Sequence, residues 1–210
     1  MRIIIIIVNI TVFLMTGLLH SQNVKDDIFK SNHDIYIGLI NKNLDVLENK
    51  FVLLGKEKIY CIGISGNRNN ADFLYKAIKQ KLYNFRIISE SDSSSSDYKV
   101  LFENVKFGTA YDKISGSVLR NRIVERQIEL SYKCIIKSKG NDSLVFNNSI
   151  HDINKDEFYL DKIDDVEKGD YDFLKGTLPD RSLFDRLLIP GIVVLTSAAT
   201  IILFFIIRSK

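Results

Sequence analysis

The chain has 210 residues, 46% of them hydrophobic, and a formal net charge of +3. Three of its 29 Lys and Arg residues (Arg2, Arg208 and Lys210) lie in two apolar ends, so the remaining basic residues balance the 26 acidic ones. This balance excludes a nucleic-acid-binding surface, which needs a clustered excess of Lys and Arg. It also excludes a polybasic membrane-binding patch.

The N-terminal end has the three parts of a secretory signal peptide. Arg2 provides the positive charge, Ile3 to Leu14 form an apolar stretch, and Gly17 and Ser21 lie in the cleavage region. We therefore predict a signal peptide over residues 1–21 that is removed from the mature protein. The alternative is an uncleaved anchor, which would give the protein two membrane spans.

The first half of the central segment alternates between helix and strand patterns. Apolar residues at helical spacing predict a helix over Asp26–Phe51, and the continuously apolar Ile59–Ile64 predicts a buried strand. Turn residues over Ser65–Asn70 precede a second helix over Ala71–Leu82. Phe85–Ile88 is a candidate for a further strand.

The second half is rich in strand patterns. Tyr98–Phe107 predicts one strand, and Val118–Ser138 contains the clearest alternation of apolar and polar residues in the chain. A hairpin turn over Gly140–Ser143 leads to a partner strand beginning at Leu144–Phe146, and Ile163–Leu174 indicates a short helix. The apolar face of the alternation consists of Ile128, Leu130, Tyr132, Cys134 and Ile136.

These elements predict one α+β domain over residues 22–178. We expect a mostly antiparallel sheet with helices on one face, because a run of strands follows the initial strand–helix–strand. The polar face of the strand over residues 118–138 would then be open to solvent.

The C-terminal end has a long uncharged stretch. About 20 apolar residues cross a hydrocarbon core of about 30 Å, so we predict a connector over 179–186, a transmembrane helix over 187–207 in contact with lipid, and a cytoplasmic tail over 208–210. Arg208 and Lys210 follow the positive-inside rule. We expect a single-pass inner-membrane protein whose domain lies outside the cytoplasm, in the periplasm.

No pattern in the chain indicates catalysis, a cofactor or a metal. Gly63–Gly66 lies where a phosphate loop would lie but lacks the rest of that motif. The acidic residues over 161–172 do not follow the calcium-loop spacing. His33 and His151 have no second His or Cys at ligand spacing, and there is no G-x-S-x-G motif.

Two groups of residues are candidates for other roles. The mixed-charge residues Arg120, Arg122, Arg126 and Glu129 form a candidate partner-binding face, and the alternative is a ladder of cross-strand ion pairs. The two cysteines, Cys61 and Cys134, are a candidate disulfide outside the cytoplasm. Buried thiols are the alternative.

The order strand, helix and strands, with the phrase Ala71–Leu82 before Phe85–Ser89, resembles small periplasmic domains of bacterial envelope proteins. The TolB amino-terminal domain and the curli-secretion lipoprotein family show this order. The chain departs from them in having no lipobox cysteine after the signal and an apolar C-terminal stretch instead. The layout also resembles uncharacterised envelope proteins with a signal, one domain and a C-terminal anchor. The resemblance implies assembly or scaffolding in an envelope complex and transfers no catalytic residue.

The sequence therefore predicts a non-catalytic envelope protein that binds an envelope protein partner. We expect the partner on an exposed strand edge or on the face over residues 120–129. One alternative is a sensing or carrier domain that binds a small ligand or metal beside Ser65–Asn70 or the acidic stretch. A second alternative is an envelope hydrolase that uses His33 or His151.

Overall fold

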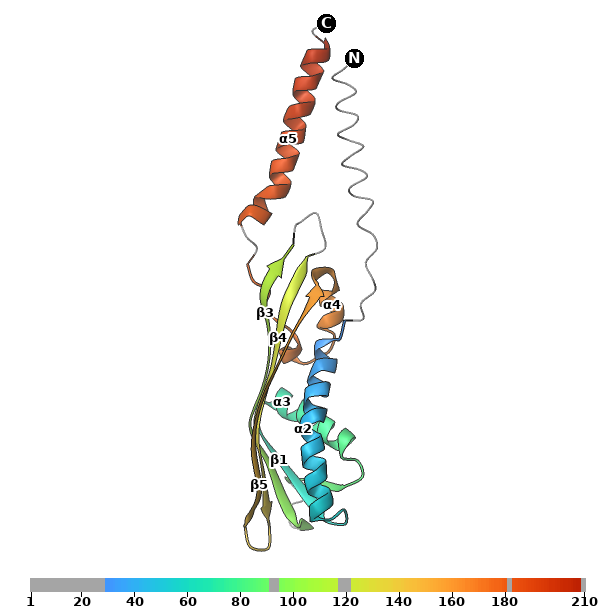
Figure 1. Ribbon diagram of the computed structural model, residues 1–210, viewed down its shortest axis with the longest axis vertical. Helices are drawn as coiled ribbons and strands as arrows, with labels where there is room; N and C mark the ends of the chain where they lie inside the picture. The colour runs from blue at the N-terminus through green and yellow to red at the C-terminus, as the bar shows by residue number, and fades with distance from the viewer. Residues whose placement is uncertain (1–28, 91–94, 117–121, 181–182, 209–210) are drawn as a thin grey trace.

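The computed structural model describes residues 29–90, 95–116, 122–180 and 183–208 (Figure 1). The expected signal peptide over residues 1–21 and Arg120 lie outside these ranges. The five strands of the sheet are β1 (Ile59–Gly66), β2 (Arg86–Ser89), β3 (Tyr98–Ser115), β4 (Ile123–Ser138) and β5 (Leu144–Tyr159). The helices are α2 (Asn32–Leu54), α3 (Arg68–Lys81), α4 (Ile163–Val166) and α5 (Leu183–Arg208), with single 3-10 turns η2 (Leu160–Lys162) and η3 (Asp172–Leu174).

The sheet is mixed, and the expectation of a mostly antiparallel sheet is wrong. Its order is β2-β1-β3-β4-β5, and β1 pairs in parallel with both β2 and β3. The chain returns through α3 before β2, and such a crossover makes successive strands parallel. The remaining pairs, β3 with β4 and β4 with β5, are antiparallel hairpin neighbours.

The alternation along β4 is confirmed, and it decides where the helices lie. The side chains at the even positions of β4 are buried, from Val124 to Ile136. Figure 1 shows α2, α3 and α4 on one face of the sheet, which is the face that these side chains occupy. The odd positions lie on the opposite, open face and are only half-buried, apart from Ile135.

Strands β3 and β5 are both longer than the sequence indicates, for different reasons. The register of β3 shifts twice, between Glu103 and Lys106 and between Tyr111 and Lys113. Asn104 has a φ of 56° at the first shift. Each bulge moves the following side chains to the other face, which hides the alternation. Strand β5 lies at the edge, so most of its side chains meet water and show no apolar period.

The main core lies between α2, α3 and the central strands. Ser31 caps α2 by accepting a hydrogen bond from the backbone of Asp34 at 3.1 Å. At the other end of α2, Phe51 stacks on Tyr60 of β1 with ring centroids 3.8 Å apart. The Tyr60 hydroxyl lies within hydrogen-bond distance of two carbonyls, those of Phe51 and Gly55. The end of α2 is thereby fixed to the first strand of the sheet.

A second, smaller core lies at the other end of the sheet, where β1 and β2 no longer contribute. Its buried members are Tyr111, Val124, Phe158 and Val166. Ile114, Leu160 and Ile163 pack against it. Here α4 and the 3-10 turn before it cover strands that α2 does not reach.

The C-terminal helix α5 has 26 residues and extends away from the sheet (Figure 1). The Thr196 and Thr200 hydroxyls donate to the carbonyls of Ile192 and Thr196, at 2.9 and 2.8 Å. The expected transmembrane helix over residues 187–207 is not found: no described helix has the combination of length and hydropathy needed to cross a bilayer.

Candidate interaction surface

The two edges of the sheet differ strongly in length. Strand β2 forms one edge with four residues, and β5 forms the other with 16. Among the described residues, β5 pairs only with β4, and its register runs without a shift from Phe146 to Tyr159. An edge strand presents a row of N–H and C=O groups, and proteins usually limit it with prolines, bulges or short strands. The long edge of β5 is therefore the most evident interaction surface of the described chain.

Two separate hollows between α2 and the inward side of β5, together called the groove, lie beside this edge. The part of the groove nearer the β4–β5 hairpin is mostly apolar, and Val46 of α2 is 51% exposed there. Phe146 and Ile150 of β5 face it. Asn43 bridges the groove by donating a hydrogen bond to Asp152 at 2.7 Å.

The part of the groove nearer the start of α2 is polar. It is lined by Lys30, Asp34, Ile35, Gly38, Leu39, Asn154 and Asp156. A Cβ added to Gly38 would meet no atom within 4 Å, so this side of α2 is open. The groove thus changes from apolar to acidic along β5.

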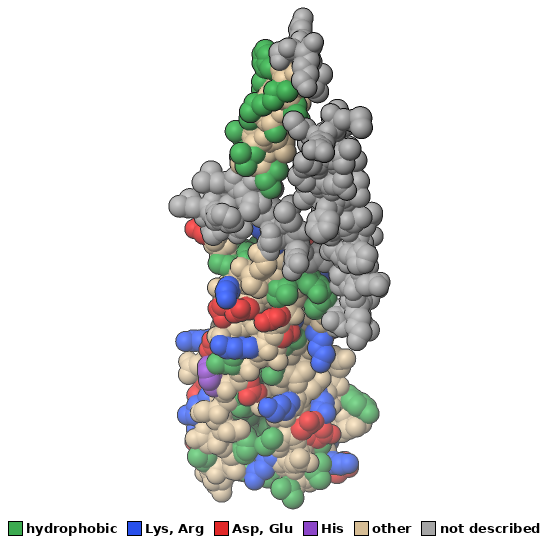
Figure 2. Space-filling view, turned by 45° about the horizontal axis from the view of Figure 1, so that its top comes forward, with side chains coloured by type: hydrophobic (Ala, Val, Ile, Leu, Met, Phe, Trp, Pro, Cys, Tyr) green, Lys and Arg blue, Asp and Glu red, His purple; other side chains and the backbone are tan. Residues whose placement is uncertain are grey.

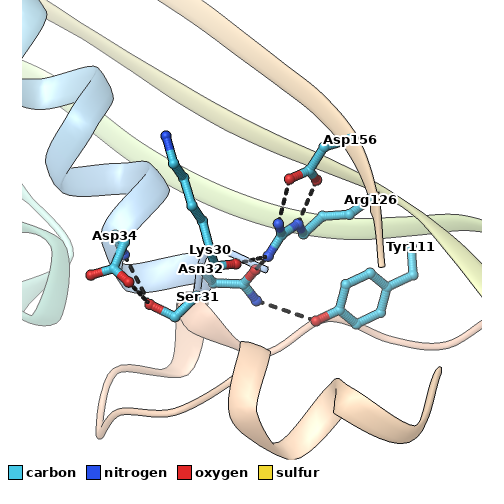
Figure 3. Close-up of polar contacts among 7 residues, drawn as sticks. All are labelled: Lys30, Ser31, Asn32, Asp34, Tyr111, Arg126 and Asp156. Carbon is cyan, nitrogen blue, oxygen red and sulfur yellow. Dashed lines mark hydrogen bonds and ion pairs between the residues drawn. The ribbon is translucent and has the colours of Figure 1, made fainter. Parts of the chain in front are cut away.

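A buried guanidinium fixes the polar end of the groove (Figure 3). The side chain of Arg126 on β4 is fully buried and forms two hydrogen bonds, of 2.6 and 2.5 Å, to the carboxylate of its cross-strand neighbour Asp156. Its Nη1 donates to the Lys30 carbonyl at 3.0 Å and to Asn32 Oδ1 at 2.6 Å. Its guanidinium carbon lies 5.3 Å from the ring centre of Phe158. A buried charge needs this full set of partners.

Asn32 extends the same network to the chain that leads to α5. Its Nδ2 donates to the Leu174 carbonyl at 2.6 Å and to the Tyr111 hydroxyl at 3.2 Å. Tyr111 donates to Glu167 at 2.8 Å, and Glu167 also accepts from the backbone N–H of Gly176 at 2.8 Å. Burial raises the pKa of Tyr111, so its hydroxyl stays protonated at neutral pH.

The structure does not bring the predicted partner face together. Arg120 lies outside the described residues, and Arg122 precedes β4, where its carbonyl accepts from Leu160. Arg126 points into the interior, whereas Glu129 lies on the open face, 3.5 Å from His151. Even and odd positions of a strand occupy opposite faces, so the idea of one face over residues 120–129 is wrong. Two cross-strand ion pairs do fit the alternative ladder: Arg126 with Asp156, and Glu125 with Lys113 at 3.9 Å.

The predicted disulfide is also not present, because Cys61 and Cys134 occupy opposite faces of the sheet. Phe102 pairs with Cys134 on the face under the helices, and Ile62 and Tyr60 lie on that face too. Cys61 lies between Tyr60 and Ile62 and points the other way. Both thiols are buried, and burial raises the pKa of Cys134 to about 12.

The residues considered for other chemistry are dispersed. His33 packs edge-on against Phe73 at the start of α2, and His151 lies on the open face of β5. No cluster of three or more His, Cys, Asp or Glu in the described ranges is arranged to hold a metal ion. In the Ser65–Asn70 turn, Asn67 caps α3 by accepting from the backbone of Asn69.

On the face that Figure 2 shows, neither sign of charge dominates among the described side chains. Figure 2 shows Lys and Arg side chains interspersed with Asp and Glu on the face in view, and hydrophobic side chains gathered along α5. Large apolar side chains of α5 are exposed, among them Leu195 at 72% and Phe205 at 66%. This apolar helix and the edge of β5 are therefore the two surfaces that stand out.

The comparisons with known proteins do not identify a family. No protein-family model matches the chain, and no curated protein matches it in sequence. One similar solved structure is a neuraminyllactose-binding hemagglutinin homologue of Helicobacter pylori, with 8% identity over 51% of this chain and 67% of that one, and a TM-score of 0.34. Another is a lipoprotein of Neisseria meningitidis, with 9% identity over 68% and 99% of the two chains, and a TM-score of 0.29. Such low scores support no conclusion about function.

Proposed function

We propose that the protein is a non-catalytic interaction module of a bacterial cell envelope, and that the edge of β5 is where it binds an envelope protein partner. The observation that carries the proposal is the 16-residue edge strand, which has no proline and an unbroken register from Phe146 onward. Adding a strand to such an edge forms main-chain hydrogen bonds without any special side-chain chemistry.

We further propose that α5 holds the domain at a membrane, with the domain outside the cytoplasm. The support comes from the sequence: residues 187–207 carry no charge, and such an apolar stretch favours contact with lipid. The exposed apolar side chains of α5 would be covered by lipid. Alkaline extraction of vesicles tests this part. The full-length chain should stay with the membrane, and its release into the supernatant would contradict the proposal.

Two adjacent proline substitutions test the edge of β5. Along an edge strand the backbone N–H groups point alternately to the neighbouring strand and to solvent. Of Ile153→Pro and Asn154→Pro, one therefore removes a ladder bond to β4 and the other only a solvent-facing N–H. Chemical denaturation identifies the variant that loses the ladder bond, because only that variant loses a hydrogen bond of the fold and is therefore less stable.

Partner capture is then measured in living cells with a photo-crosslinking amino acid at Ser149, which is exposed on β5. The matched control carries it at Gln80, which is exposed on α3. We expect a discrete adduct only from Ser149, and its loss in the proline variant that keeps its stability. An adduct that persists in that variant, or that forms equally from Gln80, would contradict binding at the edge.

A further inference from the structure

The groove beside β5 restricts which strand could add to the edge. Side chains of an added strand alternate between the open face and the inward side, so every second one would lie at the rim of the groove, next to the inward side chains of β5. At the apolar part it would meet Val46, Phe146 and Ile150. At the polar part it would meet carboxylates, and the chemistry of these determines what fits.

The acidic part of the groove has an excess of carboxylates. Asp34, Asp152 and Asp156 lie along it, whereas Arg126 is already bound by both oxygens of Asp156. Lys30 extends its ammonium away from Arg126 (Figure 3). Asp152 accepts its hydrogen bond from the neutral amide of Asn43. An inward cation on an added strand would therefore gain an opposite charge at Asp152.

This inference rests on the proposed function. We infer that the edge of β5 accepts an extended segment of a different protein. The inward residues of that segment are apolar and are followed by a Lys or Arg at the next inward position. A second copy of this chain does not fit. The inward residues of β5 are Phe146, Asn148, Ile150, Asp152, Asn154, Asp156 and Phe158, and none of them is basic. Pairing β5 with itself would bring no cation to Asp152 in any register.

The inference is tested on the full-length protein in detergent with synthetic peptides of about ten residues, the length of a long strand. In one peptide Leu and Thr alternate and a single inward Leu is replaced by Lys; in the matched peptide the same position is Glu. Each peptide is made with its sequence and with the reversed sequence, because the added strand could run parallel or antiparallel to β5. The affinity of each peptide is measured by fluorescence anisotropy. We expect the Lys peptide to bind at least about tenfold more tightly, equivalent to ~1.4 kcal/mol.

Asp152→Asn keeps an acceptor for Asn43 and should bring the two affinities to within about threefold. Asp164→Asn, an exposed acid on α4, is the matched control and should leave the preference unchanged. If both peptides bind equally to the wild-type protein and the stable proline variant loses both, the charge assignment is wrong and edge binding stands. If neither peptide binds and Ser149 gives no adduct in cells, both proposals are wrong. A dimer of the full-length chain that the stable proline variant disrupts would replace the foreign strand with a second copy.

Discussion

At the end of the sheet where five strands lie side by side, α2 and α3 cover them with apolar side chains such as Phe51 and Leu74. At the other end only β3, β4 and β5 continue, and a buried guanidinium takes the central place. The two ends differ because fewer apolar side chains are available where only three strands continue. Three strands and the short α4 cannot enclose a large apolar core, so hydrogen bonds to Arg126 and Asn32 complete the packing. Such a network is sensitive to the loss of any single member, whereas an apolar core tolerates some repacking.

The largest expected effect comes from removing the guanidinium. Arg126→Met keeps much of the side-chain volume but leaves the Asp156 carboxylate and two buried acceptors without their donor. We expect the free energy of unfolding to fall by about 3–5 kcal/mol in denaturant titrations.

Adding Asp156→Leu to Arg126→Met should restore most of that stability, because the unpaired charge is then removed as well. If Arg126→Met alone costs less than about 1 kcal/mol, the network contributes little and the contrast between the two ends of the sheet disappears.

A smaller effect is expected at the chain that joins the network to α5. A Cβ on Gly176 would lie 2.6 Å from the Tyr111 ring, so Gly176→Ala must displace Tyr111 or the connecting chain. Overpacking of this kind costs about 1–3 kcal/mol, measurable as a lower melting temperature. Gly108→Ala is the control on the same strand as Tyr111, because a Cβ there meets nothing within 4 Å. Equal melting temperatures for the two variants would show that the connector yields freely.

Removing one hydroxyl of the network should cost less again. Tyr111→Phe takes away the acceptor for Asn32 and the donor to Glu167, which we expect to cost about 1–2 kcal/mol. Tyr83→Phe is the control, since Tyr83 is 76% exposed. Urea titrations of both variants give the comparison, and a loss of the same size in Tyr83→Phe would refute the role of the hydroxyl.

The smallest effect is a pH dependence at the five-strand end. Asp97 accepts from the backbone N–H of Ile59 at 2.8 Å and from Lys58 at 3.2 Å, and chiefly the first of these holds the pKa of Asp97 below its ordinary value of 3.8. A lowered folded-state pKa adds stability that is present above the unfolded-state value and lost as the pH falls through the folded one. Asp97→Asn should therefore be less stable than the wild type at neutral pH and show a shallower loss of stability below about pH 4. Parallel acid denaturation curves for the two proteins would contradict this.

The local elements are largely readable from the sequence, and the pairing is not. The alternation along β4 and the helical spacing along α3 can be recognised from residues within each element, such as Ile128 and Leu74. The order β1, α3, β2 does indicate a parallel pair, because a helix between two neighbouring strands makes them parallel. The parallel pairing of β3 with β1 has no such signal, since no helix lies between β2 and β3. The bulge at Asn104 and the solvated edge of β5 removed the periodicity on which longer strands could have been recognised.

The interaction surface and the buried network were only partly accessible. Extending the apolar face of β4 two positions back from Ile128 places Arg126 inside, and that register is the signal that predicts a buried cation. Its partners could not be found this way, because Asn32 and Asp156 are 94 and 30 residues distant along the chain. An exposed strand edge was expected, but which strand would form it depends on the sheet order.

The chain leading to α5 is bonded to the domain through Asn32 and Glu167 and, further from α5, through Thr109 of β3, which donates to the Phe173 carbonyl at 2.7 Å. A pull along α5 would load the bonds from Gly176 to Glu167 and from Asn32 to Leu174 before it loaded the bond from Thr109 of β3 to Phe173. The β-ladders would be shielded from tension until these bonds had opened. The domain would therefore release its C-terminal tether, and gain the length of that segment, while the sheet itself stayed folded.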